Sequence, residues 1–440
     1  MHKKAQPKRF WEEIKNGFDF LLGIFSPRIE FQRRMFRIAN NMAVKGAYDG
    51  ASHDRLRASW KSSRGSADED LLFDLNDLRE RSRDLVRNDG IAAGIISTMV
   101  NNIVGHGIMP QSRVDKEIIG LSDEEADSFQ KVIEREWDKW SPHADTAGRM
   151  NFWEIQQMVQ SQVLINGEVI IVREMVDDPW RPYSLALNVI EADRLDTPWD
   201  LSQNKNIRRG VELGSRGEPI AYWIRKTHPG DYFYGNRVFF SQDFVRFPIR
   251  NEFGQLNVLH LYWKKRPGQT RGEPFFSPVL LKFKELADYM EAELVGARIA
   301  ACFSIFITKM DAYTTAMRSA SGTKNDKRLE AIEPGIIEYL NPGEQVNVAN
   351  PNRPGSQFDP FVDKILKFIG AGLGLPYELV IKDFSKSNYS SARAAILEAR
   401  KLFRCSQSWM SEKLCQPVWE LFTEECFLRG KIDAPNFCQY

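Results

Sequence analysis

The sequence predicts an α+β protein in which a strand-rich central region lies between two helical regions. Apolar residues recur at helical spacing between residues 70 and 140, and again after residue 277. Between residues 151 and 263 the pattern changes to short runs rich in Val, Ile and aromatic residues, which is typical of strands. At 440 residues the chain has the length of about three domains, and its hydrophobic share of 42% is ordinary for a globular protein.

Residues 1–66 are predicted to form an N-terminal arm, because a segment rich in Ser, Arg, Gly and Asp separates them from the first helical pattern. Between residues 3 and 37, nine basic residues stand against four acidic ones. A basic arm can contact nucleic acid, or it can be a partly helical arm that packs on a neighbouring subunit. The many apolar residues among the charges favour the second interpretation.

Two helices are predicted before the strand-rich region. The first spans residues 70–104 and ends in a segment with two glycines and a proline. The second spans residues 121–140, with Ser122 as its N-cap and Glu125 three residues later, which is the spacing of a capping box.

The strand-rich region is predicted to form a mainly antiparallel layer. Its strand-like runs are VLINGEVIIVREM, SLALNVIEADRL, PIAYWIRK and VRFPI. Polar loops at residues 177–182, 198–206 and 228–236 separate these runs. Strands in one layer next to helices in another give the α+β class.

The second half of the chain predicts two long helices around a polar segment. The helices span residues 277–307 and 358–373, and the residues between them turn polar from residue 311. If the two helices are antiparallel, residues 311–354 project from one end of the pair.

A short loop near residues 380–391 is predicted to lead into a last long helix. Ser390 or Ser391 is the expected cap of this helix, and Pro417 is the expected site of a kink.

Charge and cysteine content exclude some classes of protein. The net charge of +1 lacks the basic excess of a protein that grips nucleic acid. The five cysteines form no CxxC pair, which favours free thiols in a reducing cytosol over disulfides or a zinc site. No run reaches the roughly 18 apolar residues of a membrane span, so no membrane association is expected.

Motifs of catalysis and cofactor binding are absent from the sequence. It contains neither GxxxxGK[ST] nor HExxH, and its six histidines are scattered. Gly370, Gly372 and Gly374 favour close helix packing over phosphate binding.

The acidic residues Glu191, Asp193 and Asp196 are the best candidates for a Mg²⁺ site, but a solvated loop after a strand is the preferred interpretation. We therefore expect no catalytic residues, no metal and no cofactor, and a binding or structural role.

Several segments, in order along the chain, resemble the lambda family of tailed-bacteriophage portal proteins. The resemblance begins with Tyr48–Ala51, Arg57, Trp60 and the run LRERSRDLVRNDGIAAGIISTMVNNIVGHG, and continues with IEADRLD. Its most specific stretches are RPGQTRGEPFFSPVL, DYMEAELVGARIAA, EPGIIEYLNPGE and GLGLPYELVIKDFSKSNYSSARAAILE. Together they cover nearly the whole chain.

The resemblance implies a portal fold assembled as a ring. Its expected parts are an N-terminal arm (residues 1–66), an α/β wing (67–273) and two stem helices (274–310 and 355–375). A projecting clip (311–354) is expected between the stem helices, and a channel loop (376–391) and a last helix that leads into the crown (392–440) are expected after them.

The resemblance also implies partners and sites. The chain is expected to form a homo-oligomeric ring, a dodecamer as in the family, that conducts double-stranded DNA without reading its sequence. Other expected partners are the major capsid protein, the terminase packaging motor and head-tail connector proteins, and the expected location is the virion, with the host cytoplasm before assembly. The expected DNA-channel residues are Lys382, Lys386 and Asn388, and the expected docking residues for motor and connector are Lys324, Lys327 and Arg328.

Three other interpretations stay open at this point. The chain could be another structural protein of the virion shell, a DNA-packaging nuclease or ATPase, or a plain nucleic-acid-binding protein. The second lacks a phosphate loop and the third a basic excess.

Overall fold

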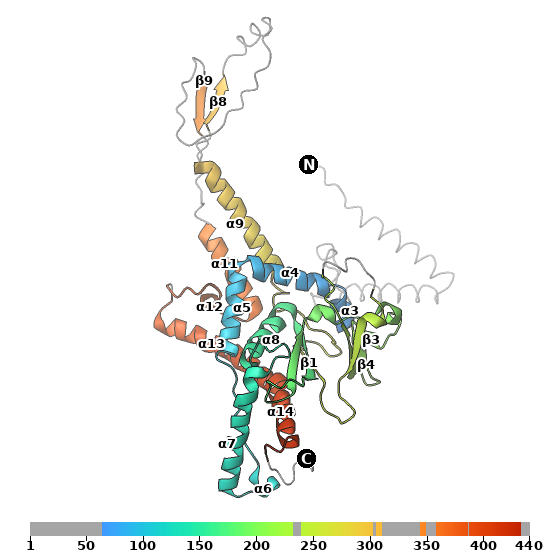
Figure 1. Ribbon diagram of the computed structural model, residues 1–440. Helices are drawn as coiled ribbons and strands as arrows, with labels where there is room; N and C mark the ends of the chain where they lie inside the picture. The colour runs from blue at the N-terminus through green and yellow to red at the C-terminus, as the bar shows by residue number, and fades with distance from the viewer. Residues whose placement is uncertain are drawn as a thin grey trace, which may run out of the picture. The chain divides into compact units, whose positions relative to one another are not determined.

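A computed structural model describes residues 64–231, 239–301, 305–309, 344–348, 358–385 and 387–432 (Figure 1). The predicted arm, apart from its last residues, and most of the predicted clip lie outside the described residues. The described body belongs to a single compact unit, residues 66–440.

Helices precede and follow a strand-rich middle, as the sequence predicts. The α-helices are α3 (Ala67–Leu72), α4 (Leu75–Asn88), α5 (Gly90–Ile103), α6 (Lys116–Ile119), α7 (Asp123–Trp140), α8 (Phe152–Asn166), α9 (Leu280–Ala301), α11 (Phe358–Leu373), α12 (Tyr377–Ile381), α13 (Tyr389–Met410) and α14 (Gln416–Leu428). The strands are β1 (Glu168–Met175), β2 (Leu185–Ile190), β3 (Ile207–Arg208), β4 (Val211–Leu213), β5 (Pro219–Arg225), β6 (Phe244–Pro248), β7 (Val258–Tyr262), β8 (Ile305–Lys309) and β9 (Glu344–Val348).

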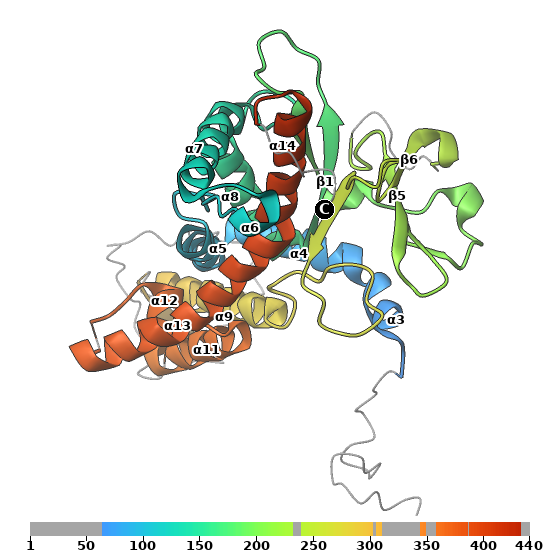
Figure 2. The same ribbon diagram turned by 90° about the horizontal axis from the view of Figure 1, so that it is seen from below.

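The strands form antiparallel sheets, which confirms the predicted pairing type. The first sheet has the order β2–β1–β7, and the second has the order β3–β4–β5–β6. Strands β8 and β9 form a separate antiparallel pair. Figure 2 shows helices α7, α8 and α14 on one side of β1 and strands β5 and β6 on the other.

Strand β1 is buried on both of its faces. Val169 and Ile171 belong to the core that the helices share, whereas Ile170 and Val172 belong to a second core with β5. Successive side chains of a strand point to opposite faces of the sheet. The continuous apolar run in the sequence therefore reflects a strand held between two layers.

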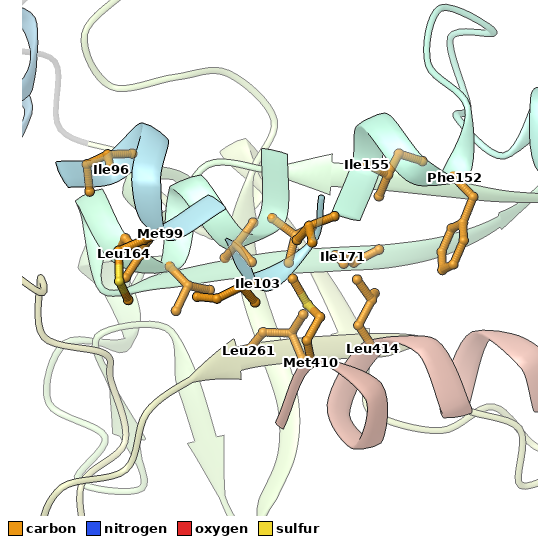
Figure 3. Packing of buried hydrophobic residues seen from close by; sticks show 14 of the residues in the cluster. Ile96, Met99, Ile103, Phe152, Ile155, Leu164, Ile171, Leu261, Met410 and Leu414 are labelled. Carbon is orange, nitrogen blue, oxygen red and sulfur yellow. The ribbon is translucent and has the colours of Figure 1, made fainter. Parts of the chain in front are cut away.

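The main core joins helices that are far apart in the sequence. Figure 3 shows Met99 from α5, Leu164 from α8, Leu261 from β7 and Leu414 from the C-terminal helical region in one cluster. Next to it, Trp137 packs against Phe152 and Phe422 with ring centroids 5.2 Å apart in both pairs. Helix α14 thus packs against α7 and β2 and completes this core.

The predicted single helix over residues 70–104 is wrong, because the structure has three helices there. Helix α4 ends at Asn88, and Asp89 starts α5 by accepting hydrogen bonds from the backbone N–H groups of Ile91 and Ala92 at 2.8 Å. Aspartate is a strong N-cap, so Asp89 followed by Gly90 favours a new start over a continuous helix.

The run VLIN was predicted as the start of a strand, and this is wrong. Residues 152–166 form α8, with a capping box between Asn151 and Glu154. Its apolar residues Phe152, Ile155, Val159 and Val163 recur at helical spacing, a signal hidden by the β-branched run that follows. Gly167 then takes a left-handed conformation with φ of 85° and separates helix from strand.

The helix predicted for residues 277–307 ends at Ala301, and residues 305–309 form β8 instead. Residue 305 pairs with residue 348, more than 40 positions later. Strand pairing depends on such distant partners, so local periodicity could not reveal it.

Other predictions are confirmed. Both hydrogen bonds of the capping box at Ser122 and Glu125 are present, and α11 has the predicted bounds.

The last helical region is interrupted before Pro417 by a π-helical turn, Ser411–Cys415. Proline lacks a backbone N–H, so it cannot continue the regular hydrogen-bond ladder at this position.

Gly370 and Gly372 are packing glycines, as the sequence predicts. A Cβ atom on Gly370 would lie 2.6 Å from the carbonyl oxygen of Leu375, and one on Gly372 would lie 2.7 Å from a methyl group of Val279. No larger side chain fits at either contact without movement.

Three cysteines lie in the described part of the chain, and all three are free thiols as predicted: Cys405, Cys415 and Cys426. Burial raises the pKa of Cys415 to about 12 and that of Cys426 to about 11. Both thiols therefore stay protonated and behave as small apolar groups. Across the described ranges, no helix is long and apolar enough to span a membrane.

Candidate functional site

Helices α9 and α11, which flank residues 302–357, lie against each other. The ring of Tyr289 on α9 stacks on Phe358 of α11 at 5.7 Å and meets Phe361 edge-on at 4.8 Å. At the start of α9, Phe283 and Leu286 are buried in the main core. One end of the pair is therefore anchored in the body, while the aromatic contacts hold the two helices together further along.

The helix pair exposes large apolar side chains at several places along its length. On α9, Leu294 is 53% exposed, and on α11, Phe368 is 58% exposed. Others are Leu281, Met290, Val295 and Phe361. Exposed large apolar side chains gathered on one helix pair favour a contact with another protein. We call these six residues the stem surface.

The segment after α11 is held close to that helix. The backbone N–H of Leu375 donates to the carbonyl oxygen of Gly370 at 2.8 Å. The hydroxyl of Tyr377 donates to Asp363 at 2.6 Å. Burial, together with this hydrogen bond to Asp363, raises the pKa of Tyr377 to about 12. The predicted loop of residues 376–391 thus contains a short helix, α12, fixed at its first residue.

Lys382, a predicted channel residue, ends α12 with an exposed side chain. Its backbone is left-handed, with φ of 56° and ψ of 32°. In the next turn, the N–H of Ser385 donates to Asp383 at 2.8 Å. Lys386, the second predicted residue, lies outside the described residues.

Asn388, the third predicted channel residue, is the N-cap of α13. Its side-chain oxygen accepts a hydrogen bond from the N–H of Ser391 at 2.8 Å. The prediction that Ser390 or Ser391 caps this helix is therefore wrong, because the helix begins earlier, at Tyr389. The polar residue just before the helix has the extended backbone that a cap requires, with ψ of 166°.

Replacing Asn388 by Ala is expected to lower the free energy of unfolding by about 1 kcal/mol, the usual cost of losing an N-cap. Asn388→Asp keeps the acceptor and places a negative charge at the helix N-terminus, so it should match the wild type or exceed it. Thermal unfolding followed by circular dichroism measures both variants. Equal stability of all three proteins would show that the cap contributes nothing.

The predicted docking residues, Lys324, Lys327 and Arg328, lie outside the described residues, and their role stays a prediction.

Two of the three candidate residues for Mg²⁺, Asp193 and Asp196, are engaged by arginines, and the third, Glu191, lies 3.3 Å from His228. Asp193 forms an ion pair with Arg83, and Asp196 lies 2.5 Å from Arg225. Burial by itself raises the pKa of Asp193, but Arg83 and the other nearby cations outweigh it and hold this pKa below its usual value. Among the described residues no group of His, Cys, Asp and Glu has the arrangement of a metal site.

A buried ion cluster around Glu168 was not predicted from the sequence. The Glu168 carboxylate, fully buried, accepts hydrogen bonds from Arg79 and Arg271 at 2.6 Å and from the N–H of Gly272 at 2.6 Å. His260 lies 3.1 Å from Oε2, the oxygen that accepts from Gly272, whereas both arginines bind Oε1. The available signal was one acidic residue at the start of an apolar strand, because a buried charge needs partners.

This cluster connects separate layers of the body. Arg79 comes from α4 and also donates to the carbonyl oxygen of Asn166 at 3.0 Å. Arg271 donates to the carbonyl oxygens of Ala192 and Leu195 at 3.0 and 2.9 Å. Glu168 therefore fixes a helix, the first sheet and the segment after β2 to one another.

Burial and charge act against each other on these groups. Burial raises the pKa of Glu168, but Arg271, Arg79 and His260 together hold it well below its usual value. Burial lowers the pKa of Arg79 to about 10, and the nearby charge of Arg271 acts in the same direction. Burial also lowers the pKa of His260, although Glu168 opposes this.

The fold thus combines a helical layer, two antiparallel sheets and an anchored helix pair with an exposed apolar surface, which suits a subunit of a larger assembly. A family model described as phage portal protein, lambda family, matches residues 53–407. The chain therefore belongs to the lambda family of phage portal proteins.

Individual relatives agree with this family. The chain is 29% identical, over 88% of its length and 73% of the relative's, to a probable portal protein of Halomonas phage phiHAP-1. It is 22% identical, over 87% of its length, to the portal protein of Escherichia phage N15 and to portal protein B of Escherichia phage lambda, covering 75% and 74% of those chains.

Solved structures with similar chains come from gene transfer agent particles. One, the virion of a native particle, has a TM-score of 0.41 and 14% identity, over 78% of this chain and 81% of that one. Another, the neck of an empty particle, has a TM-score of 0.40 and 14% identity, over 76% and 81%.

Proposed function

We propose that this chain is the subunit of a portal vertex, where copies form a ring-shaped channel for double-stranded DNA. DNA enters through this channel during capsid packaging and leaves through it during ejection. The observation that carries the proposal, beside the family, is the stem surface on α9 and α11. An anchored helix pair with several exposed apolar side chains is suited to packing against the same pair in a neighbouring subunit.

The parts of the chain take the roles that the family suggests. In this proposal residues 67–273 form the wing, α9 and α11 lie in the stem, and residues 311–354 form the clip. Residues 376–391 face the channel, and residues 392–440 lead toward the crown.

The proposed partners follow from these roles. The clip is the docking platform for the terminase motor and the head-tail connector, with Lys324, Lys327 and Arg328 as the contact residues. The ring, a dodecamer in this proposal, also contacts the major capsid protein and resides in the virion after assembly in the host cytoplasm. The energy of packaging comes from the separate motor, and this chain supplies no catalytic step.

A nearly neutral subunit suits a channel through which DNA slides. Each contact with a phosphate adds to a salt-dependent binding term, and a ring repeats every contact in each subunit. A net charge of +1 over 440 residues keeps this term small.

Electron microscopy of the purified full-length protein tests the proposal. We expect rings with a central hole. Sheets, shells or isolated monomers would instead favour another structural protein of the virion shell. ATP hydrolysis or DNA cleavage that persists through further purification would favour a packaging ATPase or nuclease.

Replacing Lys382 and Lys386 together by Ala should leave ring assembly intact, because Lys382 is exposed and contributes no core contact. DNA packaging or retention should fall severalfold, since a lysine ammonium meets phosphate as a flexible point charge. Nuclease-protected DNA per particle is the measurement.

The matched control replaces Lys116 and Lys131, two exposed lysines at α6 and α7, by Ala. It should package normally. Full and stably retained genomes in the Lys382 and Lys386 variant would refute a channel role for these lysines.

A further inference from the structure

A small polar cavity lies beside the Glu168 cluster, between α4 and the second sheet. Its volume is about 80 Å³. Arginines dominate the charged side chains that line it, which are Arg79, Arg209, Arg225, Arg271, Asp193 and Asp196. These residues come from α4, the segment after β2, the β3–β4 turn, the end of β5 and the segment before α9.

The arginines are held in place by other groups of the protein. Arg79 and Arg271 share the Glu168 carboxylate. Arg225 lies over the rings of Phe239 and Phe244, with its guanidinium carbon 4.3 and 5.6 Å from the ring centres. These side chains are therefore positioned before any ligand arrives.

Arg209 is the most accessible of the four arginines. Its side chain is 34% exposed and lies 3.7 Å from Asp196. Its backbone has φ of 46°, which is uncommon for a residue with a side chain. One of its guanidinium nitrogens donates to the carbonyl oxygen of Leu72 at 3.1 Å.

The charges around the cavity do not balance. Five arginines, the four that line it and Arg83, meet the carboxylates of Glu168, Asp193 and Asp196. The five arginines carry two more charges than these three carboxylates. Glu191 does not line the cavity and is more than half exposed, and Arg194 interacts with the charges of both Glu191 and Asp231.

An excess of buried positive charge is unfavourable unless an anion accompanies it. The Nε atom of Arg225 is buried and has no hydrogen-bond acceptor within the described part of the chain. Burial and the charge of Arg271 lower the pKa of Arg79 to about 10, which also indicates that positive charge is unfavourable here. Asp193 and Asp196, two of the three candidate residues for Mg²⁺, thus lie in surroundings that favour an anion.

We propose that this cavity binds one tetrahedral oxyanion of the size of phosphate or sulfate. Guanidinium groups match the oxygens of such anions and form short, charge-assisted hydrogen bonds with them. A cavity of 80 Å³ has room for a few water molecules or for one such anion. The bound anion neutralises the excess charge and connects the helical layer to the second sheet. This inference is independent of the proposed channel.

The source of the phosphate is the free inorganic ion rather than the DNA backbone. Two of the lining arginines, Arg79 and Arg271, are each only 1% exposed. A ligand must therefore enter the cavity completely, which a phosphate within a nucleic-acid strand cannot do.

The test measures phosphate binding to the full chain by isothermal titration calorimetry and by thermal unfolding at constant ionic strength. Inorganic phosphate should bind and raise the unfolding temperature by about 2–4 °C, because a ligand of the folded state stabilises it. Sodium chloride of equal ionic strength, and duplex DNA at an equal phosphate concentration, should give no comparable rise.

Arg209→Gln should weaken phosphate binding at least tenfold. The matched control is Arg208→Gln at the neighbouring position, which removes a similar ion pair, to Asp68 at 2.8 Å, but does not line the cavity. This control should bind phosphate like the wild type. Equal affinity in the two variants, or a rise that chloride reproduces, would overturn the proposal, and a rise with DNA alone would overturn the assignment to the free ion.

A second variant keeps the test decisive if Arg209→Gln unfolds. Asn76 lines the cavity from the first turn of α4 and is exposed. Asn76→Asp suits a helix N-terminus, so the fold is retained, while the added negative charge repels the anion. Phosphate affinity should fall severalfold in this variant, and unchanged affinity counts against the site.

Discussion

Replacing Glu168 by Gln is expected to lower the free energy of unfolding by about 3–5 kcal/mol, the range found when one partner of a buried ion pair is removed. The substitution keeps the shape of the side chain, removes its charge and turns one of its two acceptor oxygens into an NH2 donor. Arg79 and Arg271, both buried, would then lose the carboxylate that they share. Urea unfolding followed by tryptophan fluorescence measures the loss, because Trp137 and Trp140 lie in the main core.

Glu218→Gln is the matched control. Glu218 also faces an arginine, Arg216, but this pair lies on the surface, with side chains 39% and 87% exposed. Exposed pairs contribute little, so no measurable change is expected. A stability of Glu168→Gln equal to that of the control would show that the cluster does not hold the layers together.

The effect of Glu168→Gln on stability is also expected to depend on pH. The pKa of Glu168 lies well below its usual value in the folded protein. Its contribution to stability is therefore complete above the ordinary glutamate pKa of about 4.3 and is lost as the pH falls through the lower folded value. Glutamine does not titrate, so the stability difference between the wild type and Glu168→Gln should shrink as the pH falls below about 4.

Replacing Phe368 by Asp is expected to abolish ring assembly while leaving the subunit folded. Phe368 is 58% exposed, so the single chain loses little packing. In the proposed ring this side chain is covered by a neighbour, and a charge buried there without a partner is strongly unfavourable. The cost is repeated at every contact between subunits. Light scattering coupled to size exclusion should show a mass near 50.7 kDa, that of one chain, in place of a large assembly.

Trp180→Asp is the control for Phe368→Asp. Trp180 is 89% exposed but lies in the loop between β1 and β2, outside the stem surface. This variant should still assemble, and circular dichroism should show both variants folded. Rings formed by Phe368→Asp would exclude the stem surface as the subunit contact.

Local patterns in the sequence predicted the elements that depend on local chemistry. The capping box at Ser122 and the bounds of α11 are present as expected, because caps and apolar periodicity act within a few residues. Predictions failed where two local signals competed. Asp89 inside an apolar pattern starts a new helix, and the β-branched run after Gly167 obscured the end of α8.

Only part of the candidate site could be predicted from the sequence. Lys382 is exposed in the predicted loop, whereas Asn388 also has a structural role as a helix cap. The family resemblance selected both residues, and their channel role stays a proposal. The Asp193 and Asp196 pair illustrates the limit of sequence reasoning, because both ion-pair partners come from other elements.

By itself the sequence determined the α+β class, the order of helical and strand-rich regions, and the family. These properties follow from periodicity and from motifs read along the chain. Only the tertiary structure decided that Glu168, Arg79, Arg271 and His260 meet in one buried cluster beside a positively charged cavity. Burial makes charges interact strongly and makes a missing partner costly. Burial is a property of how layers pack, and it brings together residues that are nearly 200 positions apart in the chain.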